Sequence, residues 1–416
     1  MRQPPTRLQL PSFVLPKRLC AFVFLLLLFS VHPFSILRAA TVRERSSSPP
    51  QQSSSPTVAG IPLEILDKAD LRVQWFFADL PLDRADRLVQ MFIHRDQLFV
   101  LNNLGKLYAL DTQTGAINWT RSLSGTPVSA VPVSVFDDHL ILLVGNTCYQ
   151  VRLNNGSVAH QTTFDFDVTT SVARWQDRLF LGARNKRFYC VRLADRVAVW
   201  QSVCPAPPLG TVAIDRDRVY FVTRDNTLYV SSAQNRELLW KAHAVDQLTG
   251  VFIDRNQCFM PSYDTALYCL EARTGKLLWK FLAGGRLTQL PVLAEEFVYQ
   301  PIEHGGLVCL NRSDGSVLWQ LKGGKSYLTH NGPTTYAVTH DRTLAIMDQP
   351  SARRLASFYR HNFSLYAPSP HDPTLLLATA GGDILALRPD RIVAPPATPA
   401  APPPQPSADS ENTTNR

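Results

Sequence analysis

Charge is scarce in this chain, and it has no large positive surplus beyond the first 40 residues. Only 18% of the 416 residues are charged, and the formal net charge is +8. Five of the 42 Lys and Arg residues stand in residues 1–40, which contain no Asp or Glu, so 37 basic residues face 34 acidic ones in the rest. A nucleic-acid-binding protein concentrates positive charge on its folded body. The charge balance therefore argues against nucleic acid as a partner.

A long apolar run occurs only near the N-terminus, at residues 20–28 (CAFVFLLLL). The run follows Lys17-Arg18 and precedes the small residues Ala39-Ala40, a layout typical of a secretory signal peptide. We therefore expect residues 1–40 to be a signal peptide and the body to be exported, either periplasmic or extracellular. The alternative is an uncleaved signal anchor, in which residues 19–37 hold the protein to the membrane. We expect no other contact with a membrane.

Two segments lack the apolar residues that a core needs. Residues 41–60 are rich in Ser and Pro, and residues 393–416 are rich in Pro. Such segments bury too little apolar surface to offset the loss of chain entropy. We predict a disordered linker over 41–60 and a disordered tail over 393–416, which leaves residues 61–392 as the folded body.

Tryptophan recurs at a fixed interval in this body. The last four members of the series are 40, 39 and 40 residues apart, and an aromatic or β-branched residue stands eleven positions before each. His160 takes the tryptophan position in one copy. A period of about 40 residues indicates a repeat architecture. The tryptophans assigned to the repeat are Trp75, Trp119, Trp200, Trp240, Trp279 and Trp319.

Each good copy ends in a short hairpin, as in LYALDTQTGAINW (107–119) and LYCLEARTGKLLW (267–279). An apolar strand leads to a polar turn with a glycine, which supplies the positive φ of a tight turn. The turn glycines are Gly115, Gly275 and Gly315. A second β-rich pair lies upstream of each hairpin, and we find no amphipathic helical stretch. Four short strands per repeat predict an all-β fold, a β-propeller of four-stranded antiparallel blades.

The two ends of the repeat array predict how the ring closes. The copy at 384–390 stops before its outer strand, whereas residues 72–75 (RVQW) look like an outer strand with nothing before it. Pairing the two would leave no open sheet edge. We therefore predict eight blades, closed by an N-terminal strand around 71–77. Seven blades is the alternative, if the irregular copy at 344–356 is only a connector.

The hairpin pattern, with its aspartate, Thr-Gly turn and final Trp, resembles the docking motif of the pyrroloquinoline-quinone repeat family. The resemblance covers about residues 70–390 and implies that each Trp packs between neighbouring blades. The family contains calcium-dependent quinoprotein dehydrogenases. It also contains non-enzymatic members, such as the lipoprotein propeller of the bacterial β-barrel assembly machinery, and these are the more similar in style.

For a dehydrogenase, the resemblance implies pyrroloquinoline quinone with calcium, a catalytic Asp and usually two adjacent cysteines. Calcium takes six to eight oxygen ligands, several of them charged. The segments expected to form inner strands carry mainly threonines and a single carboxylate, Asp167, and no two cysteines are adjacent. We therefore expect no catalytic residue, cofactor or metal. Quinone-dependent oxidation of an alcohol or sugar remains the alternative.

Polar side chains on the expected inner strands are candidates for contacts at the mouth of the central funnel. His330 and Asn331 stand beside Gly332-Pro333, and threonines recur at matching repeat positions. A ligand or peptide could bind there, although a histidine satisfied by neighbouring backbone is the plainer explanation. The candidate residues are Thr249, Thr288, Thr329, His330 and Asn331.

The cysteines fit a buried structural role. Cys190, Cys269 and Cys309 occupy one repeat position, where a small apolar residue on a buried strand is expected. Cys258 and Cys269 flank the turn at 262–266, so a disulfide across that hairpin is a second hypothesis.

These observations favour an exported, non-catalytic propeller that acts as a scaffold for another protein or an envelope component. A quinoprotein dehydrogenase is the alternative, and binding of a polysaccharide or small ligand at the funnel is a third reading. The functional part of this conclusion rests on fold-level analogy.

Overall fold

The computed structural model describes residues 56–123, 133–360 and 362–393. The expected signal peptide or anchor, most of the linker and all but the first residue of the tail lie outside these residues. None of the helices in the described part is both long enough and apolar enough to cross a membrane.

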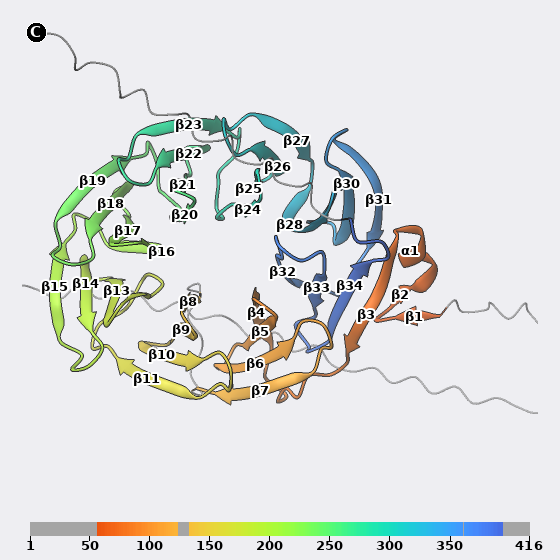
Figure 1. The fold of residues 1–416 in the computed structure, drawn as a ribbon, viewed down its shortest axis with the longest axis horizontal. Coiled ribbons are helices and arrows are strands. Elements are labelled where there is room, and N and C mark those ends of the chain that lie inside the picture. Colours follow the sequence, from red (N-terminus) through yellow and green to blue (C-terminus); the bar gives the residue numbers. More distant parts are fainter. Residues whose placement is uncertain (1–55, 124–132, 361, 394–416) are drawn as a thin grey trace, which may run out of the picture. The chain divides into compact units, whose positions relative to one another are not determined.

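Eight four-stranded antiparallel sheets follow one another around a ring (Figure 1). This confirms the predicted eight-bladed β-propeller, and the alternative of seven blades is wrong. Blades 1 to 4 consist of β4(Leu88–His94), β5(Gln97–Asn102), β6(Lys106–Asp111) and β7(Ile117–Ser122); β8(Ser134–Phe136), β9(His139–Val144), β10(Thr147–Arg152) and β11(Val158–Thr163); β12(Ala173–Trp175), β13(Arg178–Ala183), β14(Arg187–Arg192) and β15(Ala198–Val203); β16(Pro208–Asp215), β17(Arg218–Thr223), β18(Thr227–Ser232) and β19(Leu238–His243). Blades 5 to 8 consist of β20(Phe252–Asp254), β21(Gln257–Pro261), β22(Ala266–Glu271) and β23(Leu277–Leu282); β24(Val292–Ala294), β25(Phe297–Ile302), β26(Gly306–Asn311) and β27(Val317–Leu321); β28(Gly324–Asn331), β29(Thr334–Thr339), β30(Thr343–Asp348) and β31(Arg353–Tyr359); β32(Leu365–Ala367), β33(Leu375–Ala378), β34(Ile384–Pro389) and β3(Leu71–Phe77).

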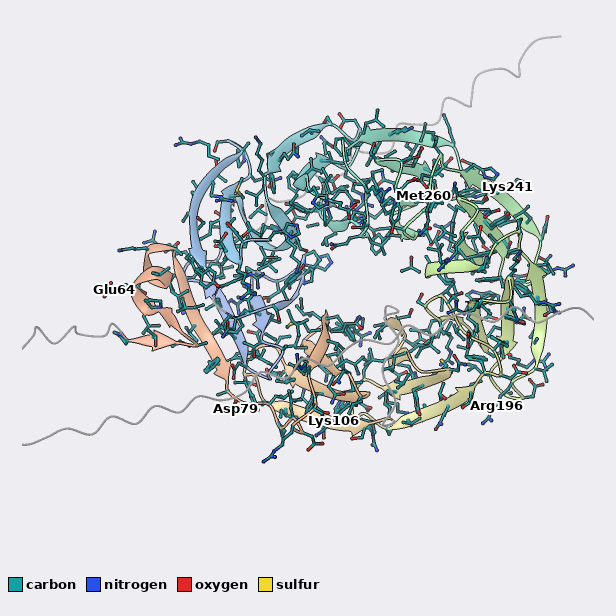
Figure 2. All side chains as sticks on the ribbon, turned by 180° about the vertical axis from the view of Figure 1, so that it is seen from behind. Glu64, Asp79, Lys106, Arg196, Lys241 and Met260 are labelled. Carbon is teal, nitrogen blue, oxygen red and sulfur yellow. The ribbon has the colours of Figure 1, made fainter. Side chains whose placement is uncertain are left out.

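The two middle strands of each blade are apolar on both faces because each blade is sandwiched between two others. In β5, for example, every residue after Gln97 is buried. The buried apolar side chains gather in eight clusters, and each cluster combines residues of two neighbouring blades. The hydrophobic core is therefore divided among the seams between blades. The outer strands and the turns that lead into them carry exposed polar side chains, such as Lys241 in β19 and Arg196 just before β15 (Figure 2).

Blade 8 is completed by the N-terminal strand β3, which pairs antiparallel with β34. The register runs from Leu71 opposite Pro389 to Phe77 opposite Ile384. Figure 1 shows these two segments side by side although they lie at opposite ends of the folded chain. The predicted closure by residues 71–77 is confirmed, and β34 has no open edge.

A short N-terminal cap, formed by β1(Thr57–Val58), β2(Ile61–Pro62) and α1(Leu63–Lys68), precedes β3. The expectation of no helix is wrong for these six residues. A segment this short is too brief to show a helical period of apolar residues, and its helix is stabilised by the burial of Leu66 against the blades. The linker predicted over 41–60 also extends too far, because β1 at residues 57–58 lies within it and pairs with β2 at residues 61–62. Figure 2 shows Glu64 of α1 on the outer side of the ring.

The cap occupies the one seam where the repeat has lost its tryptophan and its turn. Blade 7 has Ala356 at the tryptophan position, and blade 8 has no hairpin turn to receive one because its outer strand comes from the other end of the chain. Ile61 and Leu66 fill this seam in a cluster that includes Ala356. The Asp390 N–H also donates to the Asp70 carbonyl, 3.0 Å away. The cap is therefore part of the ring closure.

The antiparallel order divides the blade ends into two faces. We call the first the hairpin face; it holds the turns between the first and second strands and between the third and fourth, such as 112–116 in blade 1. We call the second the connection face; it holds the central turn of each blade and the segments that lead into the next blade, such as 283–291.

We predict that Leu66→Ala lowers the free energy of unfolding by about 2–5 kcal/mol, because it opens a cavity in the seam between blades 7 and 8. The control is Lys68→Ala, two residues further along the same helix at an exposed position. Chemical denaturation of both variants measures the difference. Equal small effects would contradict the role of the cap in closure.

Candidate functional site

In six of the eight blades a docking tryptophan packs the outer strand against the hairpin turn of the next blade. The Trp75 Nε1–H of blade 8 donates to the Thr112 carbonyl of blade 1 at 2.9 Å, and Trp119 donates to the Leu153 carbonyl of blade 2 at 2.8 Å. A side chain on the turn glycine would collide with the ring: a Cβ at Gly115 would lie 2.6 Å from Trp75. Trp240 and Trp279 donate in the same way, to the carbonyls of Ala272 and Arg312. Trp319 donates to a side-chain oxygen of the next turn, Gln349 Oε1.

Each turn glycine named from the sequence lies against the ring of the preceding blade. Gly275 receives Trp240 and Gly315 receives Trp279, and both have a positive φ. Gly156 receives Trp119 in the same manner and was missed because its repeat ends in His160 and not in Trp. Its signal was the Asn-Gly pair whose glycine stands seven residues after Tyr149, the spacing that also separates Tyr108 from Gly115.

Trp200 is the exception among the docking tryptophans. The turn of blade 4 has Arg236 at the glycine position, with φ at 68°, so the ring cannot settle there as it does on Gly115. Arg178 Nη1 donates instead to the carbonyls of Ala233 and Gln234, at 3.2 and 2.7 Å. The Trp200 Nε1–H is buried and has no partner among the described residues. The Trp200 indole therefore still packs between blades 3 and 4, but it makes no docking hydrogen bond with the described residues.

Threonines that were expected to line the funnel form a second set of bonds between blades. The Thr169 hydroxyl donates to the Pro208 carbonyl and the Thr211 hydroxyl to the Val251 carbonyl, both at 2.7 Å. Thr249 follows the same pattern and donates to the Leu287 carbonyl. These hydroxyls bind the next blade, so Thr249 is a structural residue in this fold.

The inner strands expected at 248–253 and 287–293 were placed several residues too early. The innermost strands β20 and β24 begin at Phe252 and Val292, so Thr249 and Thr288 lie in the segments that lead into them. Thr288 is exposed. The error has a physical cause: these lead-in segments alternate in polarity because one side contacts the next blade, and such alternation resembles a strand.

The remaining candidates gather on the hairpin face around a cavity of about 380 Å³. His330 and Asn331 line it from the end of β28, and Glu295 and His371 line it from two other turns. Thr329 is fully buried and donates to the Asp372 carbonyl at 2.7 Å, so it supports the turn beneath the cavity and does not open into it.

Asn331 fastens the C-terminal end of the described chain. Its Nδ2–H donates to the Arg391 carbonyl at 2.7 Å, and its Oδ1 accepts the Val393 N–H at 2.8 Å. The predicted disordered tail therefore starts one residue too early, since Val393 is held in place. The Asn331 amide is largely used by these bonds and has little capacity left for a ligand.

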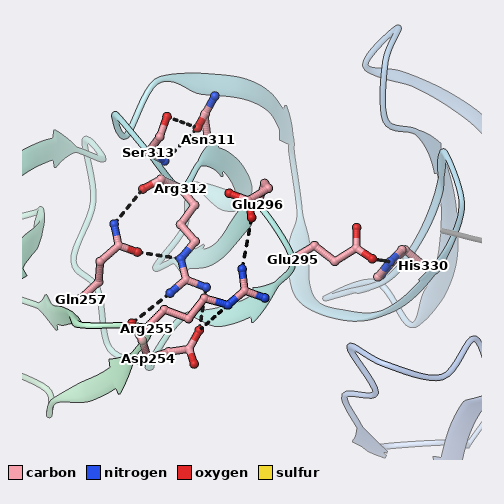
Figure 3. A network of polar contacts seen from close by, with 9 residues as sticks. All are labelled: Asp254, Arg255, Gln257, Glu295, Glu296, Asn311, Arg312, Ser313 and His330. Carbon is pink, nitrogen blue, oxygen red and sulfur yellow. Dashed lines mark hydrogen bonds and ion pairs between the residues drawn. The ribbon is translucent and has the colours of Figure 1, made fainter. Parts of the chain in front are cut away.

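His330 stands between a phenol and a carboxylate. Its Nδ1 is 2.7 Å from the Tyr327 hydroxyl, and its Nε2 is 3.7 Å from Glu295 Oε1 (Figure 3). Burial raises the pKa of Tyr327 well above its usual value, so this hydroxyl stays protonated. The plainer reading of His330, a ring satisfied by its neighbours, agrees with the two contacts. These neighbours are side chains and not the backbone.

A second polar network, between blades 5 and 6, was not predicted from the sequence. The Arg312 guanidinium is almost fully buried and reaches Asp254 Oδ2 and Gln257 Oε1, both at 2.6 Å (Figure 3). Its own carbonyl accepts the Trp279 indole N–H. Arg312 thus takes part in both the docking hydrogen bond of Trp279, through its carbonyl, and an ion pair with Asp254, through its guanidinium. Only the arginine at a buried repeat position, where other copies have Thr, Leu or Ala, could have indicated it.

The six cysteines among the described residues are buried free thiols, and the disulfide hypothesis is wrong. Cys258 stands opposite Leu270 and Cys269 opposite Phe259, a register offset of one residue. Such an offset places the two side chains on opposite faces of the blade, and they belong to different core clusters. Burial raises the pKa of the Cys269 thiol to about 12, which keeps it protonated.

The residues around the hairpin-face cavity do not fit a quinone cofactor with calcium. Calcium prefers charged and neutral oxygens, six to eight of them. The cavity offers the Glu295 carboxylate and two imidazoles, while the Asn331 amide is already bonded within the chain. Among residues 56–123, 133–360 and 362–393, no group of three or more His, Cys, Asp or Glu could hold a metal ion.

Repeated blades with a tryptophan docked on the turn of the next blade define a propeller of the pyrroloquinoline-quinone repeat class. The chain belongs to the family described as outer membrane protein assembly factor BamB, whose model matches residues 63–176, 145–254 and 248–391. No curated protein matches the chain in sequence.

Two solved structures share the fold at low sequence identity. The computationally designed protein Ika8 has a TM-score of 0.60 and 12% identity, covering 74% of this chain and 98% of its own. BamB from Moraxella catarrhalis has a TM-score of 0.59 and 14% identity, covering 76% of this chain and 97% of its own. At such identities the similarity shows the fold alone.

We predict that Trp279→Phe and Trp200→Phe affect stability differently. The first change removes a hydrogen bond to the Arg312 carbonyl and should cost about 0.5–1.5 kcal/mol more than the second, which removes a buried donor that has no partner. Urea denaturation of both variants measures the difference. A cost at Trp200 equal to or above that at Trp279 would contradict the assignment of the docking bonds.

Proposed function

We propose that this protein is an exported, non-catalytic interaction module that presents the faces of its propeller to another protein or an envelope component. Its compartment would be periplasmic or extracellular, and residues 19–37 would tether it to the membrane if the leader stays uncleaved. Membership of a family described by outer membrane protein assembly supports an interaction role.

One observation carries the non-catalytic part of the proposal: four of the five candidate side chains at the funnel mouth are engaged within the protein. Thr249 and Thr329 donate to backbone carbonyls, Asn331 holds residues 391–393, and His330 lies between Tyr327 and Glu295. A catalytic base needs a free lone pair within reach of a substrate. Groups that are already bonded serve to fix the surface on which a partner can dock.

The partner test uses a photo-crosslinking amino acid placed at three exposed positions of the full chain in its own cells. His371 reports on the hairpin face, Thr288 on the connection face, and Lys241 on the outer rim as the control. We expect a discrete crosslinked product from at least one face position, competed by excess unlabelled protein, and none from Lys241. Crosslinks that are diffuse at all three positions, or strongest at Lys241, would contradict the proposal.

We also propose that the protein has no quinone-dependent dehydrogenase activity. Hydroxyls and bonded imidazoles neither hold calcium tightly nor remove a proton readily near neutral pH. The purified body, incubated with pyrroloquinoline quinone and calcium, should gain no cofactor absorbance after gel filtration and should not reduce a dye with alcohols or aldose sugars. Stoichiometric cofactor together with substrate-dependent dye reduction would favour the enzyme instead.

A further inference from the structure

A basic pocket lies on the connection face where blade 7 leads into blade 8. Its volume is about 450 Å³. Lys325 borders it from the start of β28, His340 and Arg342 from the turn between β29 and β30, and Arg360 from the end of β31. This pocket is separate from the cavity around His330, which lies on the hairpin face.

Arg360 is the unusual member of this group. The residue is only 3% exposed, yet its Nε and Nη1 atoms are buried without a hydrogen-bond partner among the described residues. Buried donors on a charged group are almost always paired, because an unpaired one loses its hydration without compensation. Arg360 therefore lines the pocket, and its guanidinium has buried donors that lack an acceptor among the described residues.

The nearby acidic side chain does not supply that acceptor. The Asp341 carboxylate lies in the same turn as His340 and Arg342 but accepts hydrogen bonds from the Thr339 and Thr343 hydroxyls. Within the described part of the chain, neither Arg342 nor Arg360 has a carboxylate within ion-pair distance, and Lys325 has none either. Asp341 acts on Arg360 only from beyond ion-pair distance, so none of the three cations has a direct ion-pair partner in the described part of the chain.

The cations also influence one another. Lys325, which lines the pocket, has its Nζ 5.4 Å from the centre of the Tyr366 ring. Burial lowers the pKa of Lys325, and the positive charge of Arg360 lowers it further. An anion between the two groups would remove their repulsion and provide the missing acceptor.

We propose that this pocket binds a phosphate-type oxyanion, held by Lys325, Arg342 and Arg360. The three cations approach from three different segments, which suits the oxygens of a tetrahedral dianion better than the two coplanar oxygens of a carboxylate. The inference is independent of the proposed scaffold function.

The surroundings leave room for more than a free ion. A neighbouring pocket of about 470 Å³ shares Lys325 and His340 with the basic pocket and is also lined by Thr288 and Glu303. The shared chemistry is the phosphate group, either as the free ion or as a monoester whose remaining part extends into the second pocket.

The test measures binding of inorganic phosphate to the purified protein by calorimetry and by the shift in melting temperature, at constant ionic strength set with chloride. Lys325→Gln removes one of the cations of the pocket. The matched control Lys322→Gln makes the same change three residues away, at an exposed position that does not line the pocket. Glycerol 3-phosphate serves as the ester probe and acetate as the carboxylate probe.

We expect saturable phosphate binding in the wild type and in Lys322→Gln, and an affinity about tenfold weaker in Lys325→Gln. Arg360→Met should fold, because it replaces an unpaired buried charge by an apolar chain, and should lose the response to phosphate. Binding of glycerol 3-phosphate as tight as that of phosphate supports an ester ligand, and weaker binding supports the free ion. Undiminished binding in Lys325→Gln, acetate binding as tight as phosphate, or no saturable binding would each overturn the proposal.

Discussion

The docking of one indole ring on the turn of the next blade is the interaction on which the ring depends. A blade of four strands cannot bury both its faces alone, so it is stable only between two neighbours. The tryptophan provides apolar area to the seam, and its N–H fixes the angle by donating to a carbonyl of the turn, as Trp119 does to Leu153. At Gly115, Gly156, Gly275 and Gly315 a Cβ would collide with the indole, so these four turns need glycine in the observed geometry. Where Arg236 replaces glycine, the bond is lost and Arg178 takes over the carbonyl.

Closure is the second constraint, since a linear array of blades would end in two open edges. Strand β3 provides the missing outer strand of blade 8, and the cap before it fills the seam that has Ala356 in place of tryptophan. The last seam is therefore built from the N-terminal segment of the folded chain. Its stability depends on Ile61 and Leu66, residues outside the repeat.

The cavity around His330 and the basic pocket around Arg360 differ in how their polar groups are hydrogen-bonded. On the hairpin face, His330 and Asn331 line the cavity and are hydrogen-bonded to other residues of the chain. On the connection face, Arg360 has buried donors without acceptors among the described residues, and the cations beside it have no carboxylate of that part of the chain within ion-pair distance. At the hairpin-face cavity the bonded polar groups suit a docking surface, and at the basic pocket the unpaired donors of Arg360, together with two further cations, point to a ligand. Both readings follow from the cost of burying an unpaired polar group.

The sequence by itself determined the class of fold, the eight blades and the strand that closes them. The reason is that the period of about 40 residues and the Trp and Gly positions can be recognised along the sequence even where single repeats have lost one of these residues. The sequence did not determine which polar side chains are free. Thr249 and Thr329 seemed available and are bonded to other segments, while Arg360 gave no signal at all. The N-terminal helix and the register of Cys258 and Cys269 were also decided in the tertiary structure. The reason is physical: whether a donor has an acceptor depends on carbonyls and carboxylates from segments about 40 residues away, and one sequence read along its length does not specify how they meet.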